Sequence, residues 1–412
     1  MIDRNDTAKQ RTRRACVGPL ASHVEGFVAS LLRDGYAPKT VKEKCELIVD
    51  LSRWMERCRL PLMRLDEGQL TKFRISRHRG RRLQRGDMWT ARQLLRYLQD
   101  LDYIPTPQEK KDRTLLGQLT RDFERYLSSE RGLSRSTLVG YLQVVRRFLI
   151  DRFGSKAARV KALRPCDIHQ FLIGHLNAGS RSQAKGMVTA LRSFLRFLHQ
   201  RGVIATDLAA AVPAVADWRL SQLPKSLPPK QVNQLLASCD RTTAKGQRDY
   251  AMLLLIARLG LRASEVVRMT LDDLDWERGE IVVHGKGQQE AKLPLPTDVG
   301  AALVNYLRHV RPACSTRRVF IRMKAPQQGL KGNEAVGSIV RSVLMRVGLN
   351  PESKGSHLLR HSLATNLLRR GATLSEIGQL LRHKALATTQ IYAKVDIAAL
   401  RTIALPWPRG AL

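Results

Sequence analysis

Three features are scarce in this chain of 412 residues: long apolar runs, paired cysteines and acidic side chains. No apolar run is long enough to span a bilayer, and the N-terminus, MIDRNDTAKQRTRR, lacks the apolar core of a signal peptide. The six cysteines form no C-x-x-C pair, which argues against a disulfide framework and against a zinc site. We therefore expect a cytoplasmic protein without a membrane partner.

The shortage of acid leaves a strongly basic chain. Lys and Arg number 71 against 36 Asp and Glu, so the formal net charge is +35. The excess is spread out, with net charges of +9 over residues 1–110, +11 over 111–212 and +15 over 213–412. A basic protein without a polyanionic ligand is the alternative. A charge this large and this evenly spread favours nucleic acid, contacted by every domain.

The length allows two or three domains, and the apolar spacing is mostly helical. The stretch PAVADWRLSQLPKSLPPK carries four prolines and therefore predicts a linker. After it, two short strands around a Gly-rich turn predict a small antiparallel sheet within helices. The expected divisions are a disordered basic leader (1–18), an N-terminal helical domain (19–106), a second helical domain (111–208), the linker (209–229) and a mostly α C-terminal domain (230–412).

The two helical domains resemble each other in sequence. Lys39-Thr40-Val41 and Ser136-Thr137-Leu138 each begin a helix, 97 residues apart. Arg96-Tyr97-Leu98 precedes Arg196-Phe197-Leu198 by 100 residues. A period near 100 indicates a duplicated unit of four or five helices. Two unrelated amphipathic bundles would also look somewhat alike, and this alternative stays open.

A basic stretch within residues 72–85 contains no acidic residue. We interpret it as a DNA-contacting loop, although solvated charged loops are common. Its seven cationic residues are Lys72, Arg74, Arg77, Arg79, Arg81, Arg82 and Arg85.

Polar residues that suit phosphate chemistry gather between residues 357 and 392. Helical spacing covers most of this segment, HLLRHSLATNLLRRGATLSEIGQLLRHKALATTQIY. His357 and Arg360 are three residues apart and therefore share a helix face. His383 and then Tyr392, just after a Thr-Thr pair, complete the set.

The pattern H-x-x-R, L-x-x-H and T-T-x-x-Y resembles the tyrosine recombinases, also called the phage-integrase family. Upstream, LGLRASE around Arg262 resembles the first arginine motif of that family, and HGKG around Lys286 resembles its lysine hairpin. All six expected active-site positions are filled in the expected order. The motif R-G-L-S-x-x-T, from Arg131 to Thr137, resembles the start of the family's core-binding domain, and we expect Arg135 within it to contact DNA.

The resemblance implies a helical core-binding clamp followed by a mostly α catalytic domain with a small antiparallel sheet. It implies double-stranded DNA as the partner, and neither a metal nor a nucleotide cofactor. Two subunits would bind each recombination site, and a tetramer would join two sites. The N-terminal domain would be an additional SAM-like copy that binds further DNA or another subunit.

A phosphodiester resists attack because its negative charge repels nucleophiles and its alkoxide leaves poorly. Cleavage without a metal needs a cationic clamp, a proton donor and a nucleophile whose product conserves the bond energy. Arg262 and Arg360 suit the clamp, because guanidinium groups donate bidentately and stay charged. The alternative for Arg262 is a surface arginine or one in a salt bridge with Glu265, and the alternative for Arg360 is a charge on a helix surface. We interpret Glu265 as structural. Tyr392 is the expected nucleophile, and its alternative role is a buried core aromatic.

The remaining positions would handle protons. Lys286 would protonate the 5′ oxygen from a hairpin tip, although an exposed hairpin lysine looks the same, and Lys292 is a weaker competitor. His357 would either bind the scissile phosphate or accept the tyrosine proton, and His383 would donate to the same phosphate. His361 reads as a packing residue.

One departure from the family pattern concerns the residue before His383. The family usually has L-G-H, whereas this chain has Leu381-Arg382-His383. If glycine serves a close backbone approach, Arg382 changes the local geometry.

The expected activity is site-specific recombination through a 3′-phosphotyrosyl intermediate, for integration, excision or transposition of a mobile element. The alternatives are a Xer-like chromosome-dimer resolvase, a type IB topoisomerase and a non-catalytic DNA-binding accessory subunit. Each acts on DNA, so we expect a nucleoid-associated protein. The sequence leaves open whether related recombinases act with it.

Overall fold

The computed structural model describes residues 17–78, 86–106, 114–154, 160–176, 180–215, 224–285, 290–383 and 385–395. Most of the predicted leader and the hairpin tip at 286–289 lie outside the described residues. Within these ranges, no helix combines the length and apolarity that a bilayer span requires. The chain divides into two compact units, one of residues 106–219 and one that combines 1–105 with 220–412.

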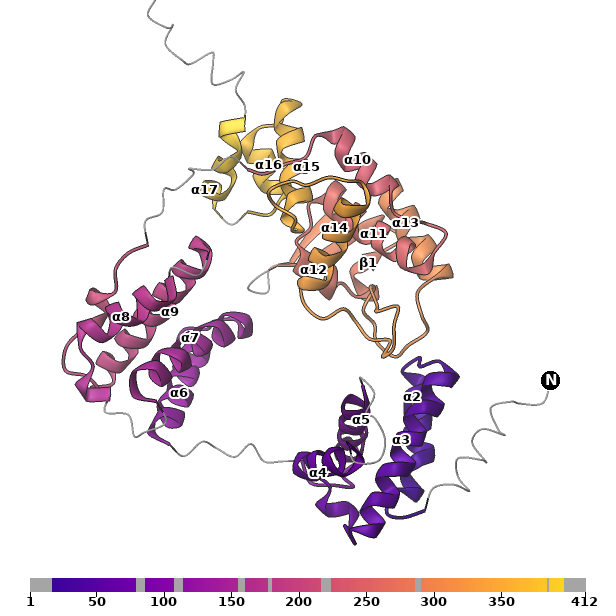
Figure 1. The fold of residues 1–412 in the computed structure, drawn as a ribbon. Helices are drawn as coiled ribbons and strands as arrows, with labels where there is room; N and C mark the ends of the chain where they lie inside the picture. Colours follow the sequence, from indigo (N-terminus) through magenta and orange to yellow (C-terminus); the bar gives the residue numbers. More distant parts are fainter. Residues whose placement is uncertain are drawn as a thin grey trace, which may run out of the picture. The chain divides into compact units, whose positions relative to one another are not determined.

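In its described residues, the N-terminal part contains four α-helices (Figure 1). They are α2 (Val24–Arg33), α3 (Pro38–Arg57), α4 (Glu67–His78) and α5 (Asp87–Asp100), with short turns η1 (Ala21–His23) and η2 (Leu62–Arg64). The prediction of a basic loop is wrong for residues 72–78, which lie on α4. Leu70 and Phe73 are three residues apart and both buried, so one helix face docks on the core while the basic residues project elsewhere.

The described residues of the second unit form four further α-helices around a core of their own (Figure 1). They are α6 (Leu115–Arg125), extended by η3 (Tyr126–Glu130), α7 (Arg135–Phe153), α8 (Pro165–Leu176) and α9 (Arg181–Gln200), with η4 (Val160–Ala162) and η5 (Leu208–Ala211). Helices α3 and α7 begin 97 residues apart, and α5 and α9 end 100 residues apart. The helix boundaries share the spacing of the sequence similarity, and duplication of the unit stays a prediction.

The start of the predicted linker belongs to the second unit. Leu208, Ala209 and Val212 are buried among its helices, and Asp207 caps η5 by accepting a hydrogen bond from the Ala209 backbone N–H at 2.9 Å. The boundary at 208 is therefore too early, because the small apolar residues just after it pack into the bundle.

The C-terminal part is built around α11, an apolar helix buried on most sides. Its elements are α10 (Pro229–Ala237), α11 (Ala244–Leu259), α12 (Ala263–Arg268), η6 (Leu271–Asp273), α13 (Thr297–His309), α14 (Glu334–Arg346), α15 (His357–Arg369), α16 (Leu374–Leu380), α17 (Leu386–Thr389) and η7 (Gln390–Val395). Helices α10, α12, α13, α14 and α15 all contact α11. The fold class predicted from the sequence, mostly α with a small antiparallel sheet, is confirmed.

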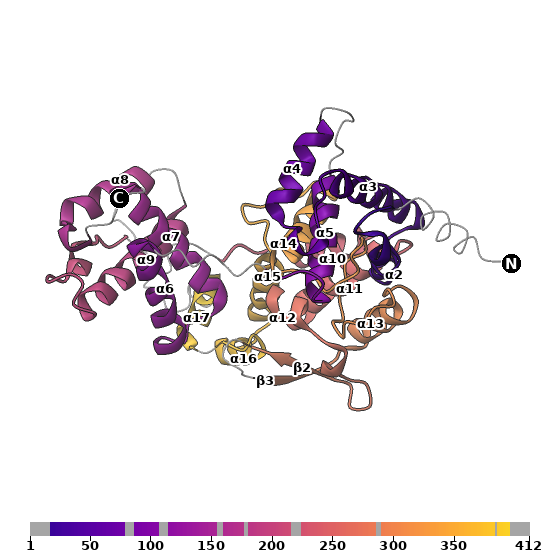
Figure 2. The ribbon, with the colours of Figure 1, turned by 90° about the horizontal axis from the view of Figure 1, so that it is seen from below.

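The small sheet has the order β1-β2-β3, from β1 (Leu274–Asp275), β2 (Glu280–His284) and β3 (Glu290–Pro294). Strands β2 and β3 pair antiparallel, with Val282 opposite Lys292. Alternate residues Ile281 and Val283 are buried in the core, so the register is set by one apolar face. Figure 2 shows the two strands along one edge of the C-terminal helices.

The N-terminal helices touch the C-terminal part through one loop. The Gln327 backbone N–H donates to the Asp34 carbonyl at 2.8 Å, and Ala325 packs against the N-terminal core. Gly35 has a φ of +80°, and an added Cβ there would lie 2.2 Å from the Gln327 side chain. The left-handed φ favours glycine here, whereas the amide of Gln327 ends a flexible side chain that can move aside.

A second glycine positions the candidate site. Gly260 ends α11 in a left-handed conformation, with φ +60° and ψ +30°. A Cβ at this position would lie 2.5 Å from Cδ2 of Leu381, which follows α16. The close approach of these two helix ends therefore needs a residue without a side chain.

We expect Gly260→Ala to destabilise the protein more than Gly279→Ala does. Gly279 shares the left-handed φ, at +61°, but an added Cβ there meets nothing within 4 Å. The left-handed conformation costs a non-glycine residue roughly 1–2 kcal/mol, and crowding adds about 1–3 kcal/mol. Urea unfolding of both variants measures the difference. Equal losses would mean that the two helix ends do not press on each other at Gly260.

Candidate active site

The structure brings five of the six predicted catalytic residues into the C-terminal part, on four segments. Arg262 precedes α12, His357 and Arg360 lie on α15, His383 follows α16, and Tyr392 lies on η7. The sixth residue, Lys286, lies outside the described residues. Its strand-borne competitor, Lys292, is exposed on β3.

Arg360 is buried and bound to backbone. The residue is only 4 % exposed, and its two terminal guanidinium nitrogens donate to the carbonyls of Gly260 and Leu381. Burial, together with the charges of Arg262 and Arg382, lowers the pKa of Arg360 to about 10, so the group stays cationic at neutral pH. A single side chain on α15 thereby joins the ends of α11 and α16.

Arg262 is held by Glu265, in the way the sequence suggested. The Arg262 backbone N–H donates to Glu265 Oε2 at 2.8 Å, and its Nη1 donates to Oε1 at 2.7 Å. Burial raises the pKa of Glu265, but the hydrogen bond from Arg262 and the charge of Arg382 outweigh it, so the net shift is downward. The Arg262 side chain is 34 % exposed, and it can therefore still donate to an incoming anion.

Arg382 adds a third guanidinium that the sequence did not reveal as part of the cluster. Its Nη2 lies 2.8 Å from Glu265 Oε2, and its carbonyl accepts a hydrogen bond from Arg262 Nη2 at 3.2 Å. Its side chain is only 14 % exposed. The departure from the L-G-H pattern therefore places a cation against the carboxylate that orients Arg262.

The backbone at Arg382 is in the left-handed region, with φ +53°. The Arg382 N–H donates to the Gln379 carbonyl at 3.0 Å, and the His383 N–H donates to the Gly378 carbonyl at 2.9 Å. This pair of bonds is the Schellman ending of a helix, whose left-handed position usually holds glycine. Arginine there costs roughly 1–2 kcal/mol.

The described histidines of the site are neutral at pH 7. Burial and the charges of Arg360 and Arg262 lower the pKa of His383 to about 4, and the same influences lower that of His357. His383 Nδ1 lies 2.8 Å from Thr389 Oγ1. If the threonine hydroxyl donates to Nδ1, the proton of the neutral ring is on Nε2, which can then donate to a phosphate.

Tyr392 is buried, with 1 % of the residue exposed, and its hydroxyl meets a histidine. The phenol oxygen lies 2.8 Å from Nδ1 of His361. Burial raises the pKa of Tyr392 to about 12, and burial, with the neighbouring His357 and the charge of Arg360, lowers the pKa of His361 to about 4. A neutral imidazole can therefore accept the phenol proton in this hydrogen bond. The sequence predicted only a packing role for His361 and did not predict this contact. It forms because His361 on α15 faces Tyr392 on η7.

The predicted DNA-binding residues have different surroundings. Lys72 and Arg74 are exposed on α4, and Arg135 is exposed at the start of α7. Arg77 is only 16 % exposed, and it pairs with Asp50 at 3.1 Å and with Asp87 at 3.4 Å. It is therefore engaged within the bundle. Arg79, Arg81, Arg82 and Arg85 lie outside the described residues.

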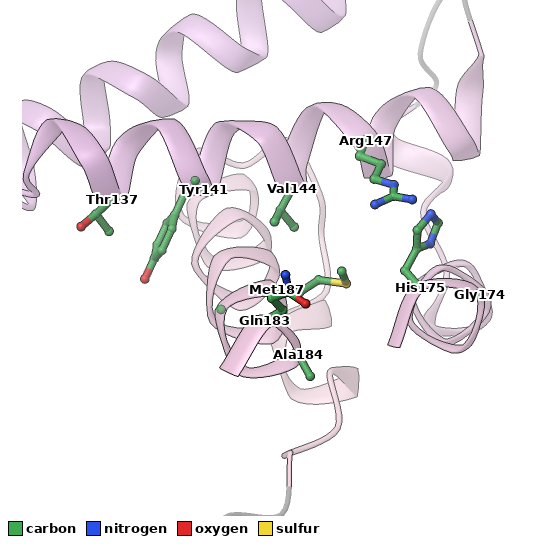
Figure 3. A pocket seen from close by; sticks show the side chains of 11 residues that line it. Thr137, Tyr141, Val144, Arg147, Gly174, His175, Gln183, Ala184 and Met187 are labelled. Carbon is green, nitrogen blue, oxygen red and sulfur yellow. The ribbon is translucent and has the colours of Figure 1, made fainter. Parts of the chain in front are cut away.

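The second unit carries a cavity of about 490 Å³ between α7, α8 and α9. Figure 3 shows Arg147 and His175 facing each other at one end of it, with Tyr141 farther along α7. No group of three or more His, Cys, Asp or Glu residues in the described part of the chain is arranged to hold a metal ion.

Comparison with known proteins identifies the two parts. The model of the phage integrase family matches residues 225–398, and that of the phage integrase N-terminal SAM-like domain matches 121–202. The putative integrase/recombinase y4rA of Sinorhizobium fredii is 42 % identical over 396 residues, which cover 96 % of each chain. The chain belongs to the phage integrase family. It is a tyrosine recombinase, which cleaves and rejoins DNA, and the predicted family and enzyme class are confirmed.

Two further matches cover part of this tyrosine recombinase. The tyrosine recombinase XerD of Listeria monocytogenes serotype 4b is 32 % identical over 294 residues, 70 % of this chain and 97 % of XerD. A crystal structure of a lambda integrase (75–356) dimer bound to a COC′ core site matches with a TM-score of 0.53. It is 17 % identical and covers 72 % of this chain and 98 % of that one, so it supports the fold alone.

We expect His361→Ala to slow DNA cleavage about tenfold, the scale of one lost hydrogen bond. His361→Asn should retain most of the rate, because the Asn oxygen can occupy the place of Nδ1 and accept from the phenol. Single-turnover cleavage of a nicked duplex measures both variants. If His361→Ala cleaves as fast as the wild type, the contact with Tyr392 plays no part in the reaction.

Proposed function

We propose that this recombinase moves a mobile element by site-specific strand exchange, with Tyr392 as its nucleophile. The observation that carries the proposal is that Arg262, Arg360, His383 and Tyr392 lie on neighbouring segments of the C-terminal part, each held by hydrogen bonds to groups beside it. These groups are Glu265 for Arg262, the Gly260 and Leu381 carbonyls for Arg360, Thr389 for His383 and His361 for Tyr392. The 42 % identity to y4rA, named a putative integrase/recombinase, extends over nearly the whole chain and supports the mobile-element role. The similarity to XerD keeps chromosome-dimer resolution as the second candidate.

In the proposed reaction the Tyr392 oxygen attacks phosphorus and the bond to the 5′ oxygen breaks. The phenol proton passes to a neutral imidazole, and Lys286 supplies a proton to the leaving oxygen. Arg262 and Arg360 stabilise the charge on the non-bridging oxygens. The product is a 3′-phosphotyrosyl bond and a free 5′-hydroxyl, and attack by another 5′-hydroxyl reverses the step. No external energy source is required, because each step is a transesterification.

Double-stranded DNA would lie against the second unit and the catalytic part. Helices α7 and α9 together carry eight Lys/Arg and one Asp, whereas α3 and α5 of the first copy carry seven Lys/Arg and six Asp/Glu. Because phosphate contacts need excess positive charge, the second copy is the better clamp. Arg135 and Arg147 on α7 are proposed phosphate contacts. The nearly neutral helices α3 and α5 suit contact with protein.

We further propose two subunits at each site and four in the assembly that joins two sites. The lambda integrase structure, which is a dimer on a core site, supports the first of these numbers. Such a protein would act in the cytoplasm, at the nucleoid. Whether it exchanges strands alone or with related recombinases is tested by adding them to the same reaction.

Covalent capture tests the proposal. The wild-type protein, incubated with nicked duplexes from around its own gene, should form a 3′-linked DNA adduct that Tyr392→Phe abolishes. Tyr250→Phe, in a tyrosine of the same domain, should retain the adduct. Tight DNA binding without any adduct would instead favour a non-catalytic accessory subunit, and relaxation of supercoils without joining of two sites would favour a topoisomerase.

A further inference from the structure

Arg382 occupies a position where an arginine needs a compensating contact. It is the left-handed residue that ends α16, with φ +53°. In the described part of the chain, only two other residues besides glycine have a positive φ, Arg59 and Asp102. Glycine or asparagine would adopt this conformation with less strain.

The side chain of Arg382 points into the catalytic cluster rather than into solvent. Its Nη2 pairs with Glu265 at 2.8 Å and its Nη1 donates to the Leu380 carbonyl at 3.2 Å. Its Nε is buried and has no hydrogen-bond partner. Glu265 is therefore the one charged group, among the contacts that the structure describes, that holds this guanidinium in place.

Glu265 is fully engaged between two arginines. Its side chain is 3 % exposed, Oε1 accepts from Arg262 Nη1, and Oε2 accepts from both the Arg262 backbone and Arg382 Nη2. The Arg382 carbonyl also accepts from Arg262 Nη2 at 3.2 Å. Arg262 is thus restrained on one side by a carboxylate that Arg382 fixes, and on the other by Arg382 itself.

The charges of the cluster do not cancel. Among the described residues, the cluster holds three guanidinium groups, Arg262, Arg360 and Arg382, and one carboxylate, that of Glu265, which leaves an excess of two positive charges. An anion that accumulates charge as it reacts is stabilised most by cations that are already oriented. Removal of Arg382 would both lower this excess and free Glu265 to rotate.

We propose that Arg382 is a positioning residue of the cleavage reaction, which fixes Glu265 and so aims Arg262 at the scissile phosphate. This inference rests on the proposed function. If glycine replaced Arg382, the backbone would be less strained. Glu265 would lose its ion pair with Arg382, however, and would hold the Arg262 guanidinium less firmly towards the phosphate.

Three replacements separate the side chain from the backbone. Arg382→Gly and Arg382→Asn both accept the left-handed conformation and lose the cation, and each should slow single-turnover cleavage about tenfold while the Kd for DNA stays within about twofold. Arg382→Lys keeps a cation and should recover part of the rate. Arg59→Gly is the matched control, because Arg59 is exposed, has φ +50° and lies in the N-terminal part. It should cleave at the wild-type rate.

A substrate with a methylphosphonate at the scissile position distinguishes positioning from loss of folding. This group lacks one anionic oxygen and needs less cationic stabilisation, so the ratio of the wild-type rate to the Arg382→Gly rate should fall towards one. A variant that is merely misfolded would lose the same factor on both substrates. An equal loss on both, or wild-type cleavage by Arg382→Gly, overturns the inference.

The double variant Arg382→Gly/Glu265→Gln completes the test. If Arg382 acts through Glu265, the two losses should be less than multiplicative, and fully multiplicative losses would contradict that route. Absence of cleavage by the wild-type protein would count against the proposed function rather than against the role of Arg382, so the two failures are distinguishable.

Discussion

The buried guanidinium of Arg360 is the contact on which the site depends. It donates to the carbonyls of Gly260 and Leu381, which are the cap residues that end α11 and α16. Carbonyls at helix C-termini lack intrahelical partners and carry partial negative charge, so they suit a buried cation. Because Arg360 lies on α15, this one side chain joins three helices. Arg262 comes two residues after Gly260, and His383 comes two residues after Leu381, so the same contacts also position these two residues.

The same burial determines the protonation of the site. Desolvation and neighbouring cations keep His361 and His383 neutral, while burial raises the pKa of Tyr392 to about 12. A protonated phenol beside a neutral imidazole does not attack a phosphate without losing its proton. Cationic side chains near a phosphate therefore have two effects, since they stabilise the charge on its oxygens and favour the phenolate form of the nucleophile.

Much of this arrangement is readable from the sequence, because motif spacing reports helix faces. The helical spacing around His357 and Arg360 and the two short runs around a Gly-rich turn correctly predicted a helix and a strand pair, and Glu265 three residues after Arg262 correctly predicted a local contact. The contacts of His361 with Tyr392 and of Arg382 with Glu265 were not predictable in this way. They join residues 31 and 117 positions apart. Packing of η7 on α15 creates the first contact, and the position of Arg382 after α16, next to α12, creates the second. The prediction of a loop at residues 72–78 was wrong because it relied on the run of basic residues and did not consider the helical spacing of the apolar residues Leu70 and Phe73.

Hydrogen exchange of an Arg360→Met variant tests most directly whether this guanidinium organises the site. Methionine is long and uncharged, so it fills space without capping the two helix ends. The backbone amides around residues 258–262 and 379–383 should exchange faster together in Arg360→Met, and should be unchanged in Arg258→Met, a variant of an arginine on α11 that pairs with Asp298. Faster exchange confined to α15, or none at all, would show that the two helix ends keep their places without Arg360 and would contradict this account.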